Sequence, residues 1–343
     1  MGQRTVDVHC HWYPMEYMEY LVSRGKEKTP YCIHDGGTHY RMYYKGVPVA
    51  HIDRAGHYDL EARIRDLDAA GLDTQLLSVT IPGPESLERD AGIYWAKKCN
   101  DHLAEAARKY PGRFYHMASL PYQDPDAACE ELERCKKMGA VGIQMFSNVN
   151  GEPVFLEKFH PIYQIADKHD MPFLVHPAVP LTAAVMDMMR LPYQLWGYTL
   201  DTSMAVMSMI FQGVFGKFPR LTLVHGHLGG TVPYFVRRIQ DAYKGYGKEW
   251  GIELKEAPDI TYKNRVYPDT TSFYKPAMKC CLEWVGPQQL IIGTDYAHRV
   301  GDPEGAIKAV KEVGQEFGLK QDEVDLILGK NAERIFHLPP MKK

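Results

Sequence analysis

Apolar, β-rich runs alternate with helical patterns along most of the chain. Eight strands are expected from these runs, the weakest at 270–274; they are residues 5–11, 73–80, 114–120, 140–146, 172–177, 221–227, 270–274 and 289–294. Helical patterns lie between and after them, at 60–71, 88–109, 124–138, 155–169, 201–215, 231–244, 276–285 and 303–317. Runs that are buried on both faces and linked by helices indicate a parallel sheet. Without a break in composition, the pattern predicts an α/β fold, a single (β/α)₈ TIM barrel over residues 1–343.

Two segments interrupt this alternation. Residues 12–58 follow the first strand and are rich in tyrosine and histidine. An insertion at this point emerges at the C-terminal mouth of a barrel, where active sites lie, so we expect it to wall a pocket there. The second segment, residues 245–269, is polar and contains proline. At the C-terminal end of the chain, residues 329–336 resemble a capped helix that docks on the body.

Bulk composition limits the class of protein. A net charge of −3 gives no reason to expect nucleic acid or an anionic membrane as a partner. An apolar run of about 18 residues, which a membrane span needs, is absent from the sequence. The seven cysteines form no CxxC pair, which fits free thiols in a reducing compartment. With no room for a signal peptide before the first strand, we expect a cytoplasmic location.

Polar side chains stand near the predicted C-terminal ends of the strands. His9 and His11 are two residues apart, so they share one face of the first strand. The fifth strand ends in His176 and the eighth in Asp295. Three histidines and one carboxylate that converge on a barrel axis could bind one divalent metal ion and leave room for water. The fourth strand carries Gln144 instead of a lysine that could bridge two metals, which favours a single ion.

Each of these residues also has a purely structural interpretation. His9 and His11 could be ordinary strand residues, and His176 could be a core histidine. Asp295 could cap the helix expected from residue 303. The metal site is favoured because all four residues fall at the same end of the alternating pattern, whereas the structural interpretation needs several separate coincidences.

Motifs in order along nearly the whole chain resemble the amidohydrolase superfamily. They are similar to its amidohydrolase 2 branch, around 2-amino-3-carboxymuconate 6-semialdehyde decarboxylase. The main motifs are Asp7-Val-His-Cys-His11, Phe173-Leu-Val-His-Pro177, His227-Leu-Gly-Gly-Thr-Val-Pro233 and Gly293-Thr-Asp-Tyr296. Together these motifs are specific for the branch and much less specific for a substrate.

The resemblance implies a role for each residue of the predicted site. It implies one divalent metal ion, usually zinc and sometimes manganese, held by His9, His11, His176 and Asp295. It implies that His227 is the catalytic histidine. The resemblance assigns no role to His225, which is either a hydrogen-bonding partner of the site or a packed residue. The family is often dimeric, so a homodimer is expected.

The chain departs from the family pattern beside the predicted pocket. Arg54 matches the second of two arginines by which the decarboxylase grips substrate carboxylates, and Ala50 stands at the first. Because a guanidinium fork suited to carboxylates is missing, we expect a different substrate from that dicarboxylate. His298 adds a histidine at the rim, and Trp196 is expected to wall the pocket together with the tyrosines of the insertion.

These features predict a metal-dependent nonoxidative decarboxylase, a C–C lyase, of an unsaturated or aromatic carboxylic acid. Arg54 would hold an anionic group, His227 would move a proton or polarise an oxygen, and Asp295 would deliver a proton to carbon. The alternative is a hydrolase or hydratase in which metal-activated water attacks a lactone, an amide or a ring-cleavage product. A third hypothesis is a noncatalytic barrel that kept the ligands.

Overall fold

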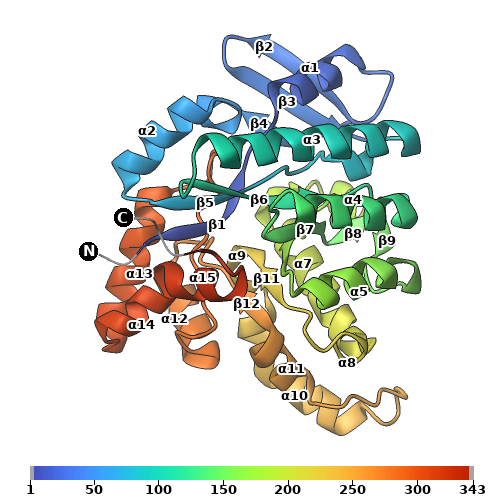
Figure 1. The fold of residues 1–343 in the computed structure, drawn as a ribbon. Coiled ribbons are helices and arrows are strands. Elements are labelled where there is room, and N and C mark those ends of the chain that lie inside the picture. Colours follow the sequence, from blue (N-terminus) through green and yellow to red (C-terminus); the bar gives the residue numbers. More distant parts are fainter. Residues whose placement is uncertain (1–3, 340–343) are drawn as a thin grey trace.

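The computed structural model describes residues 4–339 and has an α/β architecture. Seven parallel strands form one curled sheet in the order β1-β5-β6-β7-β10-β11-β12. Their bounds are β1 (Val6–His11), β5 (Thr74–Ser78), β6 (Phe114–Ser119), β7 (Gly142–Phe146), β10 (Phe173–His176), β11 (Leu223–His225) and β12 (Val266–Pro268). Figure 1 shows the strands inside and the helices around them. The predicted parallel α/β sheet is confirmed, and its first six strands lie where the sequence places them.

The last predicted strand, at 289–294, is not a regular strand. The segment meets the two edges of the sheet through isolated bridges, from Ile291 to Asp269 beside β12 and from Tyr296 to Cys10 of β1. Two single bridges do not make a continuous ladder. The prediction of a regular strand at 289–294 is therefore wrong. The segment nevertheless lies between the first and last strands of the curled sheet.

The weak strand predicted at 270–274 is also wrong. The seventh strand is β12, and residues 270–274 form a turn that leads to the next helix. β12 has only three residues and directly follows α11 (Pro258–Arg265). Three residues are too few to show the alternation of apolar and polar side chains that marks a strand. The proline in this run also argues against a strand.

Each predicted helix is present. The bounds are α2 (Leu60–Ala70), α3 (Arg89–Lys109), α4 (Pro125–Lys137), α5 (His160–His169), α7 (Gly197–Phe211), α10 (Val232–Tyr246), α12 (Lys275–Val285) and α13 (Pro303–Phe317). Side chains of Asp59, Asp124 and Asp302 accept hydrogen bonds from first-turn backbone N–H groups of α2, α4 and α13. Asp302 therefore caps the helix that begins at Pro303, and Asp295 is not needed for this structural role.

The segment 12–58 folds into a helix and a small antiparallel sheet. These elements are α1 (Met15–Ser23), β2 (Tyr31–Gly36), β3 (His39–Tyr44), β4 (Val47–Ile52) and the 3₁₀ helix η1 (Ala55–His57). The strands pair in the order β2-β3-β4, and Figure 1 shows them at the top of the molecule beside α1.

Short elements connect these parts. They are η2 (Pro84–Ser86), β8 (Asn148–Val149), β9 (Glu152–Pro153), η3 (Glu157–Phe159), α6 (Ala183–Met188), η4 (Tyr193–Leu195), α8 (Val214–Lys217), α9 (Gly226–Gly229), α14 (Gln321–Asp325), the π-helix η5 (Leu326–Lys330) and α15 (Asn331–Ile335). Within residues 4–339, no helix is both long enough and apolar enough to cross a bilayer.

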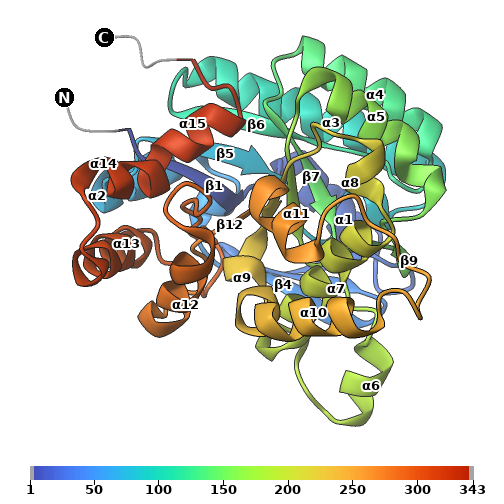
Figure 2. The same ribbon diagram turned by 90° about the horizontal axis from the view of Figure 1, so that it is seen from below.

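The C-terminal segment closes the core inside the sheet. A buried cluster there takes one or more side chains from most of the strands, namely Val6, Val8, Leu76, Met117, Leu174, Val224 and Tyr267, together with Ile291 and Phe336. β7 contributes Gly142, and a Cβ at this position would lie 2.7 Å from the Phe336 ring. Figure 2 shows α15 beside β1. The expected terminal helix therefore docks on the body, as a π-turn followed by α15.

Candidate active site

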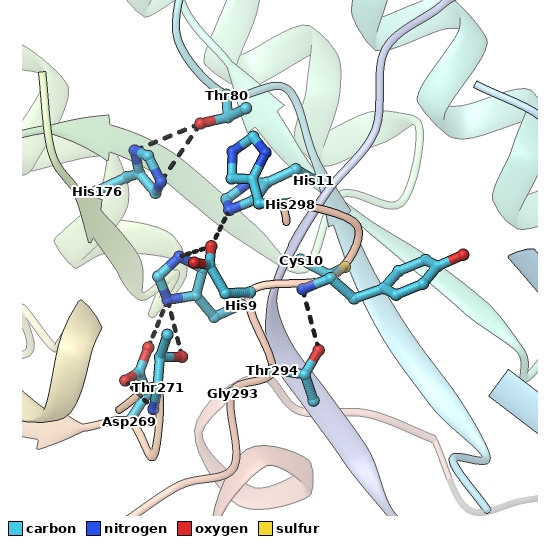
Figure 3. A network of polar contacts seen from close by, with 12 residues as sticks. His9, Cys10, His11, Thr80, His176, Asp269, Thr271, Gly293, Thr294 and His298 are labelled. Carbon is cyan, nitrogen blue, oxygen red and sulfur yellow. Dashed lines mark hydrogen bonds and ion pairs between the residues drawn. The ribbon is translucent and has the colours of Figure 1, made fainter. Parts of the chain in front are cut away.

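The residues predicted to bind a metal ion lie together. His9 and His11 belong to β1, His176 ends β10, and Asp295 lies in the segment that joins the edges of the sheet. One ligand atom from each residue lies within 4.8 Å of those of the other three, and all four side chains are buried. Figure 3 shows His9, His11 and His176 gathered around one point.

The chemistry of this cluster fits a divalent metal ion. The His9 Nε2 and His11 Nδ1 atoms are buried without a hydrogen-bond partner among the described residues, which is costly unless another group takes the lone pair or proton. The Asp295 Oδ1 atom lies 2.9 Å from His11 Nε2 and 3.7 Å from His9 Nε2. Burial and neighbouring imidazoles lower the pKa of His11 and His176 well below its usual range. Neutral imidazoles and a carboxylate are ligands that zinc and manganese accept.

Asp269 orients the first ligand, and the sequence did not reveal it. Its Oδ2 atom accepts a hydrogen bond of 2.5 Å from His9 Nδ1, while its Oδ1 atom accepts from the backbone N–H groups of Leu228 and Thr271. The proton on Nδ1 leaves the lone pair of His9 on Nε2, the atom that faces Asp295. Asp269 directly follows β12, so a carboxylate at the end of a strand was the available signal, and it was lost with the misplaced strand.

A second buried carboxylate fixes the segment that carries Asp295. The Asp7 side chain accepts hydrogen bonds from the Thr294 hydroxyl at 2.6 Å and from Gln75 Nε2 at 2.7 Å. It also accepts from the backbone N–H groups of Thr294 and His9. Burial raises the pKa of Asp7 to about 6, although these hydrogen bonds oppose the shift. Asp7 therefore ties β1, β5 and the residue before Asp295 into one unit.

His227 stands beside the cluster on a strained turn. The chain leaves β11 at His225, and both His227 and Leu228 adopt left-handed backbone angles, with φ of 56° and 58°. Such angles cost about 1 kcal/mol or more for a residue with a side chain, and the Leu228 N–H bond to Asp269 holds this turn. The His227 ring centroid lies 5.0 Å from that of His9. Burial, assisted by His9, lowers the pKa of His227 to about 4, so the ring is neutral near pH 7.

His225 has a packing role. Its Nδ1 atom lies 3.0 Å from the Tyr262 hydroxyl, and its ring is fully buried. A Cβ at Gly230 would lie 3.3 Å from its Nε2 atom, so the turn passes directly over the ring. His225 and His227 do not lie on the same face of a strand, because the regular strand β11 ends at His225.

A pocket of about 810 Å³ opens over the cluster. His176, His227, Asp295 and His298 line it, and the wall includes Val47–His51 of β4 and residues around η4 and the start of α7. The volume suits a small organic ligand. Five consecutive residues of the 12–58 segment thus form part of the wall.

A family model described as amidohydrolase matches residues 6–338. The chain belongs to the amidohydrolase family. The resemblance seen in the strand-end motifs is thereby confirmed over almost the whole of this amidohydrolase.

Relatives of this amidohydrolase include named decarboxylases. One is 2-amino-3-carboxymuconate-6-semialdehyde decarboxylase of Dictyostelium discoideum, 28% identical over 343 residues, which cover 98% of this chain and 92% of the relative. Gamma-resorcylate decarboxylase of Rhizobium sp. (strain MTP-10005) is 35% identical over 249 residues, which cover 69% of this chain and 76% of the relative. The prediction that the chain is an enzyme of this superfamily is confirmed by this kinship.

A solved structure gives the same fold. 5-Carboxyvanillate decarboxylase from Novosphingobium aromaticivorans, complexed with manganese and 4-hydroxy-3-methoxy-5-nitrobenzoic acid, matches with a TM-score of 0.83 and 24% identity. The match covers 98% of this amidohydrolase and 97% of that chain.

Of the three residues predicted to bind substrate in this amidohydrolase, one lies on the pocket wall and two do not. His298 lines the pocket, whereas Arg54 and Trp196 are not part of the described pocket wall. The Arg54 guanidinium donates to the carbonyl of Gly301 at 3.1 Å, and Trp196 is 57% exposed at the start of α7. Arg299 is the arginine that lines the pocket, and it pairs with Asp53. The substrate-binding roles of Arg54 and Trp196 stay predictions.

Proposed function

We propose that this amidohydrolase is a metal-dependent nonoxidative decarboxylase of an aromatic or unsaturated carboxylic acid. The observation that carries the proposal is the buried cluster of three histidines and one aspartate on the wall of a pocket sized for a small molecule, with His227 beside it. The decarboxylase names of its relatives support the reaction type.

We propose one divalent ion, zinc, with manganese as the other candidate, held by His9, His11, His176 and Asp295. The partnerless Nε2 atom of His9, 3.7 Å from Asp295 Oδ1, supports this ligand set. When bound, the ion supplies positive charge that stabilises negative charge on the substrate as it reacts. Manganese in the solved carboxyvanillate decarboxylase supports the second candidate.

His227 and Asp295 are proposed to handle the proton. Decarboxylation adds a proton to the carbon that bears the carboxylate; the C–C bond then breaks, its electron pair stays with the substrate, and CO₂ leaves. Asp295 would take up a proton and deliver it to that carbon. His227, neutral because its pKa is lowered to about 4, would hydrogen-bond a substrate oxygen or accept a proton from it.

Product analysis tests the reaction type. The metal-loaded enzyme would be incubated with a panel of hydroxybenzoates, carboxyvanillate and muconate-type acids in ¹⁸O-water. We expect release of CO₂ with a proton in its place and no ¹⁸O in the organic product. Incorporation of ¹⁸O without CO₂ would instead establish a hydrolase or hydratase.

We also propose a homodimer, formed through an exposed apolar patch around α6. The patch comprises Leu181, Val185, Met188, Met189, Leu195 and Trp196, all of them at least 45% exposed. Figure 2 shows α6 projecting from the body, and a patch of this kind on a monomer marks an interaction site. A Met188→Glu variant should run as a monomer in light scattering, whereas Tyr274→Glu, at an exposed residue just before α12, should stay dimeric.

A cytoplasmic location is proposed as well. All seven cysteines are free in the structure, and five of them are buried. Free thiols are the usual state in a reducing compartment.

A further inference from the structure

Two histidines outside the ligand set form a hydrogen-bonded pair beside it. His57 Nε2 and His298 Nδ1 are 3.2 Å apart, and the ring centroid of His298 lies 4.4 Å from that of His11. Figure 3 shows His298 next to His11. His298 lines the pocket, while His57 is fully buried behind it at the end of η1. The pair thus connects the 12–58 segment to the pocket wall.

The position of His57 is fixed on three sides. Its backbone N–H group and its Nδ1 atom are 3.1 Å and 3.2 Å from the same acceptor, the carbonyl oxygen of Arg54. Its own carbonyl accepts a hydrogen bond of 2.7 Å from the N–H group of Tyr13, just beyond β1. The imidazole therefore has one available orientation relative to the strand that carries the ligands.

These contacts assign the protons of the pair. A carbonyl oxygen only accepts, so His57 Nδ1 carries a proton. Burial lowers the pKa of His57 well below its usual range, so the ring is neutral and its Nε2 atom has a lone pair. His298 Nδ1 must then be the donor in the 3.2 Å contact. In the neutral His298 ring, the remaining lone pair is on Nε2, the nitrogen that the pair leaves free for the pocket.

We propose that His57 is a positioning residue that holds His298 in one tautomer, with its Nε2 atom as an acceptor for a hydroxyl or amino group on the substrate ring. The proposal rests on the proposed function, because it takes an aromatic acid as the occupant of the pocket. It names the substrate class more narrowly: an aromatic acid that carries a hydrogen-bond donor. A second carboxylate at this position would face a lone pair and be disfavoured.

Ligand binding tests the pair without turnover. We would measure, by calorimetry on metal-loaded enzyme, the affinities of 2-, 3- and 4-hydroxybenzoate and of their methoxy analogues, which cannot donate. At one ring position, the wild type should bind the hydroxybenzoate roughly threefold to tenfold more tightly than its methoxy analogue. This ratio corresponds to the net free energy of one hydrogen bond. No preference at any position would overturn the proposal.

Matched variants separate positioning from folding. His57→Leu should abolish the preference, and His57→Gln should retain it, because the Gln carbonyl can accept the proton of His298 Nδ1. His116→Leu, a change at a buried histidine outside the pocket wall, should also retain it. Equal loss in His57→Gln and His57→Leu would mean that His57 is only structural and would overturn the proposal.

A spectroscopic signature gives the tautomers directly. In ¹⁵N-histidine spectra of the zinc-loaded enzyme, assigned with the His57 and His298 variants, both residues should carry a proton on Nδ1 and none on Nε2. A proton on His298 Nε2 would overturn the proposal. Failure of the decarboxylation assay would leave these binding and spectroscopic results in place, so the two failures are distinguishable.

Discussion

At the scale of single residues, the ligands depend on groups that bind no metal themselves. His9 is a useful ligand only if its Nε2 lone pair faces the cluster, and the 2.5 Å hydrogen bond from its Nδ1 atom to Asp269 imposes that tautomer. The same aspartate holds the backbone of Leu228, next to His227. One carboxylate thus sets both a ligand and the turn of the proposed catalytic histidine.

Replacing Asp269 by Asn should therefore weaken metal binding. A neutral amide holds the His9 N–H group less strongly than a carboxylate does, so we expect metal affinity to fall about 10- to 100-fold. Chelator competition measures this change. Glu131→Gln is the control, because Glu131 is equally buried and bonds Asn100 of α3 and Arg134 of α4, which are not part of the cluster. An equal fall in both variants would contradict a specific role for Asp269.

His227 should be separable from the ligands by mutation. We expect His227→Ala to retain one metal ion per chain and to lose about 10²- to 10⁴-fold in kcat, the usual worth of a positioned proton-transfer group. Metal analysis and turnover of the same preparation provide both values. Loss of the ion would make His227 a ligand and remove its assignment as a proton-transfer residue.

At the scale of elements, residues at the ends of strands with a clear apolar run in the sequence were predictable. His9, His11 and His176 follow or end apolar runs whose period gives their position. Asp269 was not, because β12 has three residues and no loop before it. His57 was not either: the sequence places the 12–58 insertion at the pocket, but the insertion has no barrel period, so only the fold shows that His57 contacts His298 on the pocket wall.

The 3₁₀ helix η2, in the loop after β5, carries a buried acid with a testable titration. Glu85 is 5% exposed, its Oε2 atom has no partner within residues 4–339, and burial raises its pKa from 4.5 to about 8. Because the folded-state pKa is the higher one, the stability linked to this proton is full below pH 4.5 and is lost as the pH rises through 8.

Between pH 6 and pH 9, the wild type should therefore lose roughly 2 kcal/mol more of its unfolding free energy than Glu85→Gln does. Urea unfolding at both pH values, with saturating metal, measures the difference. Glu105→Gln, at an exposed site on α3, should follow the wild type. Parallel pH profiles of Glu85→Gln and the wild type would rule out this titration.

The C-terminal segment should contribute to stability without touching the site. The Phe336 ring fills the space that Gly142 leaves in β7, inside the core of the sheet. Phe336→Ala should lower the unfolding free energy by about 3–5 kcal/mol, the range for an aromatic side chain removed from a core. Metal content at low temperature should stay at the wild-type value. A cost below about 1 kcal/mol would mean that the segment is not part of the core.

At the scale of the whole molecule, the proposed metal ion joins distant parts of the chain. Its ligands come from β1, β10 and the segment at 290–296. This segment connects the two edges of the sheet through isolated bridges and separate backbone hydrogen bonds, among them Val8 N–H to the Ile292 carbonyl and Ile291 N–H to the Pro268 carbonyl. The least regular part of the sheet thus carries the carboxylate ligand. An ion bound there would stabilise the closure of the sheet, where the backbone ladder is discontinuous.

Removal of the metal should consequently destabilise the fold. An ion at 100 times its Kd adds about 2.7 kcal/mol to the unfolding free energy, because it binds the folded state alone. We expect chelator-treated enzyme to unfold at a lower temperature and to recover when zinc or manganese is returned. Hydrogen exchange should locate the loosening at residues 290–296 and at the end of β1. In His11→Ala the chelator should have almost no effect on Tm; a drop as large as in the wild type would place the stabilising ion at another site.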